Sequence, residues 1–97
     1  MKKENVLKQL KTHLSEIKQK FGVRELALFG STSRGTATVK SDIDILVSFD
    51  GPANSQRYFG LQFYLEDLLG TPVDLVTDKA LRPELRPHVE REAIHVR

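Results

Sequence analysis

Residues 30–47 read GSTSRGTATVKSDIDILV, and the rest of this 97-residue chain can be interpreted from them. The segment follows the apolar run LALF at residues 26–29, and it ends where carboxylates alternate with aliphatic side chains. This alternation predicts a strand over residues 41–49, because successive side chains of a strand point to opposite faces. The expected core face carries Ile43, Ile45, Val47 and Phe49, and the opposite face carries Asp42, Asp44, Leu46 and Ser48.

Asp42 and Asp44 are close enough on one strand face to bind a divalent cation together. Two carboxylates at this spacing repel each other unless a positive charge lies between them. Aspartate is also depleted in strands, so two of them in one strand need a reason beyond a solvated surface. Carboxylate oxygens suit Mg²⁺, which is usually bound by one or two carboxylates together with the phosphates of a substrate.

The turn at residues 30–35 has the composition of a phosphate-binding loop. Gly30 and Gly35 allow positive φ angles and a close approach of the backbone to a ligand. Ser31 offers a hydroxyl group, and Arg34 can form charge-assisted hydrogen bonds to phosphate oxygens. Taken alone, the turn fits equally well a tight strand connection with an exposed arginine. The carboxylates that follow it favour the phosphate-binding interpretation.

The pair Gly30-Ser31, followed after ten residues by Asp42-Ile43-Asp44, resembles the signature of the DNA polymerase β-type nucleotidyltransferase superfamily. The longer segment 30–47 resembles the smallest members, the minimal nucleotidyltransferases (MNT proteins). The fold implied by this resemblance is α/β (α+β), a small mixed β-sheet with helices packed on it, like the palm of polymerase β.

The resemblance also implies roles for individual residues. Asp42 and Asp44 would bind two Mg²⁺ ions, and Asp74 would complete the site of the ion next to the acceptor hydroxyl. Gly30 and Ser31 would hold the β- and γ-phosphates of ATP, and Arg34 would neutralise phosphate charge. The expected site residues are Gly30, Ser31, Arg34, Asp42, Asp44 and Asp74.

Helical periodicity precedes and follows the central segment. Apolar residues recur every three or four positions over residues 6–21, which predicts an amphipathic helix that stops at Gly22. Residues 55–69 predict a second helix, with Ser55 as its cap and an apolar stripe that begins at Phe59. A last helical segment would be capped by Thr77 or Asp78 and interrupted by Pro87.

Short strands are predicted at residues 23–29, 73–76 and 93–96. Asp74 alternates with aliphatic neighbours in the second of these. If that strand pairs beside residues 41–49, Asp74 can join Asp42 and Asp44. The alternative is a surface carboxylate at the end of a strand.

Composition narrows the functional class. The length predicts a single domain over residues 1–97, with no room for a separate nucleic-acid-binding domain. The formal charge of +2, without a dense basic cluster, argues against direct nucleic-acid binding. The absence of cysteine fits a cytoplasmic protein, and no apolar run is long enough to span a membrane.

MNT proteins of this size are known as antitoxins paired with HEPN-domain ribonuclease toxins. The resemblance therefore implies transfer of AMP from ATP to a tyrosine hydroxyl of such a toxin, in a complex of the two proteins. Two alternatives stay open: an antitoxin that neutralises its toxin by contact alone, and a nucleotidyltransferase that acts on a small molecule or a nucleic-acid end.

Overall fold

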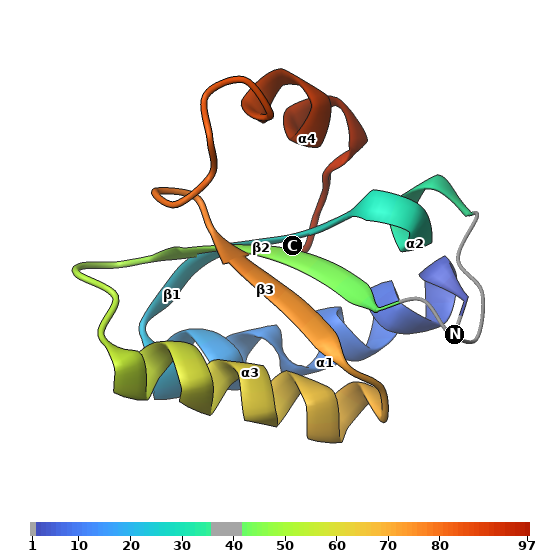
Figure 1. Cartoon of the computed structure of the whole chain (residues 1–97). Helices are drawn as coiled ribbons and strands as arrows, with labels where there is room; N and C mark the ends of the chain where they lie inside the picture. Colours follow the sequence, from blue (N-terminus) through green and yellow to red (C-terminus); the bar gives the residue numbers. More distant parts are fainter. Residues whose placement is uncertain (1, 36–41) are drawn as a thin grey trace.

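A computed structural model of the chain describes residues 2–35 and 42–97, and its centre is one four-stranded mixed sheet (Figure 1). The strand order is β3-β2-β1-β4. The strands span Val23–Phe29 (β1), Ile43–Phe49 (β2), Val73–Thr77 (β3) and Ile94–His95 (β4). β1 pairs antiparallel with β2 and β4, whereas β3 runs parallel to β2. The mixed α/β class expected from the sequence is confirmed.

Helices α1 (Lys3–Phe21) and α3 (Ser55–Leu69) cover one face of the sheet (Figure 1). The predicted stop of α1 is confirmed: Gly22 adopts φ 67° and its N–H donates to the Lys18 carbonyl oxygen. The core between the helices and the sheet is aliphatic, and its fully buried members include Val6, Leu10, Ile17, Leu28, Ile45, Val47, Leu61 and Leu65.

The predicted alternation of β2 is confirmed on its core side. Ile43, Ile45 and Val47 are at most 3% exposed, whereas Asp44 and Leu46 between them are half-buried. Residues 36–41, including the predicted first strand residue Ser41, lie outside the described part of the chain. Ser48 is buried on the opposite face, because the C-terminal part of the chain covers that end of the sheet.

Two expectations for α3 are wrong. Asn54, not Ser55, caps the helix: its side-chain oxygen accepts a hydrogen bond of 2.8 Å from the Arg57 N–H. Phe59 is 51% exposed rather than part of the buried stripe. The buried face is set by leucines at four-residue spacing, and a residue two positions before Leu61 lies on nearly the opposite side of the helix.

Side chains of α3 also hold the outer edge of β3. Gln62 Nε2 donates to the Val73 carbonyl oxygen at 3.1 Å, and the Val73 N–H donates to Glu66 Oε2 at 2.9 Å. Because Val73 is the first residue of β3, these bonds fix where the strand starts and which residue of β3 lies beside Asp44.

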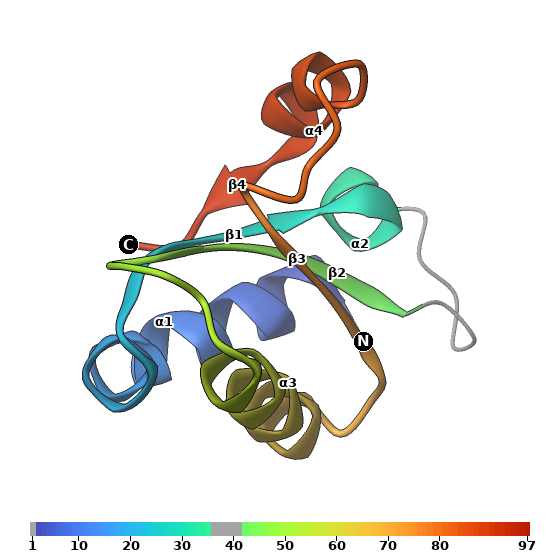
Figure 2. The ribbon, with the colours of Figure 1, turned by 60° about the vertical axis from the view of Figure 1, so that its left-hand side comes forward.

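Residues 78–95, which we call the C-terminal arm, lie over the sheet face opposite α1 and α3 (Figure 2). The arm contains α4 (Arg86–Glu92) and returns to the sheet as β4, which confirms the predicted last strand. The expected cap and interruption are wrong. Thr77 Oγ1 accepts from the Ala80 N–H in a turn, and Pro87 lies in the first turn of α4, where its missing N–H has no cost.

Candidate active site

The 30–35 segment forms one short helix, α2 (Gly30–Arg34), directly after β1. Gly30 enters it at φ 72°, and Gly35 ends it at φ 77° with its N–H directed at the Ser31 and Thr32 carbonyl oxygens. Ser33 is buried, and its hydroxyl donates to the Gly30 carbonyl oxygen at 3.1 Å. Both glycines therefore occupy backbone conformations that side chains other than glycine rarely adopt.

Gly30 lies directly against the carboxylate of Asp44. A Cβ atom on Gly30 would be 2.0 Å from Asp44 Oδ2, which is far inside contact distance. The closeness follows from the ladder, since Phe29, the last residue of β1, pairs with Asp44 near the start of β2. The sequence predicted that Gly30 lets a ligand approach the backbone, but it did not reveal that the nearest group is this carboxylate.

Asp74 lies beside Asp44 in the parallel ladder of β2 and β3. The two side chains share a hydrogen bond, and the charge of Asp42, at the entry to β2, also acts on Asp44. Asp42 and Asp74 are exposed and Asp44 is half-buried. The structure thus brings the three predicted carboxylates to one end of the sheet, next to Gly30 and α2.

This crowding changes the protonation of Asp44. Burial, the charge of Asp74, the hydrogen bond to Asp74 and the charge of Asp42 together raise the pKa of Asp44 from 3.8 to about 6, and Arg34 opposes the shift. Burial is the largest of these causes and the neighbouring carboxylates add to it, so Asp44 holds its proton more tightly than an exposed aspartate does.

The donor set fits Mg²⁺ in chemistry, because it consists of carboxylate oxygens only. Among residues 2–35 and 42–97, however, no three acidic or histidine side chains converge closely enough to hold one ion together. The side chains of Asp44 and Asp74 contact each other. The carboxylate of Asp44 occupies the space next to Gly30 that a side chain at that position would fill. A metal role for Asp42, Asp44 and Asp74 stays a prediction.

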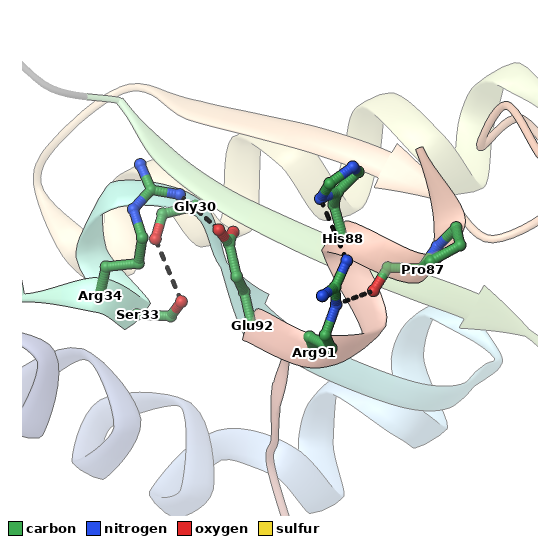
Figure 3. A network of polar contacts seen from close by, with 7 residues as sticks. All are labelled: Gly30, Ser33, Arg34, Pro87, His88, Arg91 and Glu92. Carbon is green, nitrogen blue, oxygen red and sulfur yellow. Dashed lines mark hydrogen bonds and ion pairs between the residues drawn. The ribbon is translucent and has the colours of Figure 1, made fainter. Parts of the chain in front are cut away.

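Arg34, at the end of α2, is bound by the C-terminal arm. Its Nη1 lies 2.8 Å from Glu92 Oε1, and Figure 3 shows the two side chains pointing toward each other from α2 and α4. The guanidinium is half-exposed and acts on the charge of Asp44, so it remains near the carboxylates. Sequence analysis missed Glu92, because no local pattern connects two residues so far apart in the chain.

A second polar cluster lies farther along the same face of the sheet. Ser48 Oγ donates to Asp78 Oδ2 at 3.2 Å and accepts from Arg24 at 3.3 Å. Arg86 Nη2 donates to the Asp78 carbonyl oxygen at 2.9 Å. The bond between Ser48 and Asp78 attaches the beginning of the arm to β2, and the bond from Arg86 lies within the arm. None of these residues was predicted to contribute to the site.

Comparison with known proteins places this geometry in a family. Residues 10–96 match the family model described as a nucleotidyltransferase domain. The protein adenylyltransferase MntA of Thermococcus cleftensis is 41% identical over 93 residues, which cover 96% of this chain and 94% of the relative.

Two solved structures are similar in fold. A "putative minimal nucleotidyltransferase" superposes with a TM-score of 0.82 at 36% identity, over 97% of this chain and 95% of the other. A toxin-antitoxin structure with AMP-PNP superposes with a TM-score of 0.74 at 25% identity, over 90% of this chain and 72% of the other.

Proposed function

This chain belongs to the nucleotidyltransferase domain family and is a nucleotidyltransferase enzyme, and we propose that it transfers AMP from ATP to a hydroxyl group of a partner protein. The observation that carries the proposal is the position of Asp44, which lies against Gly30 and beside Asp74. This contact joins the predicted phosphate-binding turn to the predicted carboxylates, so that one bound nucleotide can touch both.

In the proposed site, Asp42, Asp44 and Asp74 would hold Mg²⁺ after their side chains turn toward one ion, which would neutralise the triphosphate and orient its phosphates for in-line attack. Gly30 and Ser31 contact the β- and γ-phosphates. Arg34 has donors besides the Nη1 atom that faces Glu92, and we propose that one of them binds a phosphate oxygen.

The proposed reaction needs no covalent intermediate with the enzyme. The acceptor oxygen forms a bond to the α-phosphorus, the bond from that phosphorus to the bridging oxygen breaks, and pyrophosphate leaves while the hydroxyl proton passes to solvent. Positioning and charge neutralisation supply the catalysis. Asp74 is exposed at the edge strand, so the acceptor approaches from the side of β3.

We further propose that the acceptor is a tyrosine of a HEPN-domain ribonuclease toxin and that this protein is its cytoplasmic antitoxin. The similarity to an adenylyltransferase named MntA over nearly the whole chain supports this, as does the likeness to a toxin-antitoxin structure with AMP-PNP.

The proposal is tested by intact-mass spectrometry of a HEPN-domain toxin, which we expect to be encoded beside this protein, after incubation with this protein, ATP and Mg²⁺. A mass gain in whole AMP units is expected with the wild-type protein and is expected to be absent with Asp42→Asn/Asp44→Asn. Asp67→Asn is the matched control, because Asp67 is an exposed carboxylate on α3, in the layer on the other face of the sheet.

If the wild-type protein forms a tight complex without any mass gain, neutralisation by contact alone replaces the proposal. A gain that is equal in wild type and Asp42→Asn/Asp44→Asn would contradict the assigned residues while leaving the acceptor class in place.

A further inference from the structure

A cavity of about 380 Å³ lies under the C-terminal arm, on the sheet face that carries Asp44. Its floor is apolar and includes Ala27, Leu46 and Leu81. Leu46 is two residues from Asp44, so its side chain points to the same face about 7 Å farther along β2. The cavity therefore lies on the Asp44 face of the sheet, farther along β2 than the carboxylates.

The arm is attached on both sides of this cavity. At the site end, Glu92 of α4 pairs with Arg34 of α2 at 2.8 Å (Figure 3). At the far end, Asp78 accepts from Ser48 Oγ at 3.2 Å, and its carbonyl oxygen accepts from Arg86 Nη2 at 2.9 Å. The arm thus spans the cavity as a bridge from the predicted phosphate-binding turn to the end of β2.

The lining combines the two kinds of surface that a nucleoside needs. The flat faces of a base pack on apolar side chains, and its edge and the ribose hydroxyls need donors and acceptors. The rim supplies carboxylate acceptors from Glu25 and Glu90 and an imidazole from His95. A volume of about 380 Å³ lies at the small end of the range for ligand sites, which suits a ligand of nucleoside size.

The structure contains a larger cavity that does not fit this role. It has a volume of about 530 Å³ and lies between α3 and β3, with walls that include Tyr58, Phe59 and Leu75. Leu75 is buried and alternates with Asp74, so this wall belongs to the face opposite the carboxylates. Of these two cavities, the one under the arm lies on the sheet face that carries Asp44.

We infer that the cavity under the C-terminal arm binds the nucleoside part of the donor nucleotide while the phosphates lie at α2. This inference rests on the proposed function and extends it, because it assigns the arm a direct role in nucleotide binding. Ala27 is the most informative position, since it pairs with both Leu46 and His95 and a larger side chain there would enter the cavity.

The test compares two probes in the presence of Mg²⁺ by isothermal titration calorimetry. One is α,β-methylene ATP, whose α–β bond cannot be cleaved, and the other is inorganic tripolyphosphate, which has no nucleoside. Ala27→Leu is expected to weaken binding of the analogue about tenfold or more and to change tripolyphosphate binding less than about twofold. Ala53→Leu, the same substitution in the wall of the other cavity, is expected to change neither.

Glu25→Gln/Glu90→Gln keeps the test decisive if Ala27→Leu fails to fold, because both side chains are exposed. We expect it to weaken analogue binding by about threefold to tenfold and to leave tripolyphosphate binding unchanged. Unchanged analogue binding in folded Ala27→Leu, or an equal loss for both probes, overturns the inference. A wild-type protein that binds neither probe contradicts the proposed function itself.

Discussion

Asp44 and Ile45 are neighbours on β2, yet Ile45 is fully buried among aliphatic side chains whereas Asp44 is half-buried beside a second carboxylate. The same strand thus contributes to a core on one side and to a charged site on the other. The core face gains stability from burial, and the site face carries a charge repulsion that a proton or a cation relieves. The core face of β2 therefore provides the rigidity that holds the neighbouring carboxylates in place.

The largest expected effect is on catalysis at the site face. Asp42→Asn/Asp44→Asn is expected to lower AMP transfer about a thousandfold or more, because the carboxylates that we propose hold the cation are lost. Thermal unfolding should show a melting temperature equal to or above that of the wild type. The rate is measured from the mass gain of the partner over time, with Asp67→Asn as the control. If the double variant lost activity because it was unfolded, the result would contradict the prediction that the site face of β2 can be changed without loss of stability.

Ile45→Ala tests the core face of the same strand. The side chain is fully buried, so its truncation should lower the free energy of unfolding by about 2–5 kcal/mol. Urea denaturation followed by circular dichroism measures this change. Transfer activity per folded molecule should stay near that of the wild type, and a loss of activity in the folded fraction would show that the two faces are not independent.

Gly30→Ala tests the contact between α2 and the carboxylates. The added Cβ atom would lie 2.0 Å from Asp44 Oδ2. The substitution would also place an alanine at a φ angle of 72°, which strains the backbone. We expect a loss of about 2 kcal/mol in unfolding free energy and a clear loss of nucleotide binding. Gly70→Ala is the matched control, because Gly70 has φ 68° with nothing within 4 Å of the added atom. Equal losses in both variants would show that only backbone strain matters at Gly30.

The pH dependence of stability tests the repulsion on the site face. Because the folded pKa of Asp44 is about 6, above its ordinary value of 3.8, the native state binds the proton more tightly than the unfolded chain does. This contribution to stability is present below about pH 4 and is lost as the pH rises through 6. Without metal, we expect the loss to be about 1 kcal/mol, because solvent screens a half-buried group.

Carbon-13 NMR of the Asp44 carboxyl measures the pKa directly. We expect a value near 6 in the metal-free protein and a fall toward or below the ordinary range in the presence of Mg²⁺. A pKa that does not respond to Mg²⁺ would argue against Asp44 as a ligand.

The smallest effect is expected for Glu92→Gln. The ion pair with Arg34 is partly exposed, and such pairs contribute less than about 1 kcal/mol to stability. We therefore expect the free energy of unfolding, measured by chemical denaturation, to change by an amount close to the experimental error. A loss of several kcal/mol would show that the arm, rather than the core, holds α2 in place.

Much of the fold was predictable because it depends on local patterns. The period of α1, its stop at Gly22 and the alternation of β2 are all visible in short windows of sequence. The outward orientation of Phe59 was not visible, because the choice of buried face depends on which leucines meet the sheet. Pro87 was misjudged for a similar reason, since proline both interrupts helices and begins them.

For the candidate site, the sequence predicted a set of residues, whose roles stay a prediction, but few of the contacts between them. Asp74 was expected beside Asp44 only if two strands paired, and the parallel ladder pairs them directly. The Arg34–Glu92 pair and the cavity at Ala27 join segments from opposite ends of the chain. No spacing rule predicts such contacts, because they depend on how the arm folds back over the sheet.

Local sequence patterns predicted which residues of β2 face the core and which residue types suit a phosphate and cation site, because alternation and helical period are properties of the local backbone. Three features appear only in the tertiary structure. Gly30 lies against Asp44, and burial together with the neighbouring carboxylates raises the pKa of Asp44. The arm covers a cavity on the same face of the sheet. These features depend on distances between segments that are far apart in the chain. Such distances are set by the packing of the whole sheet with its helices.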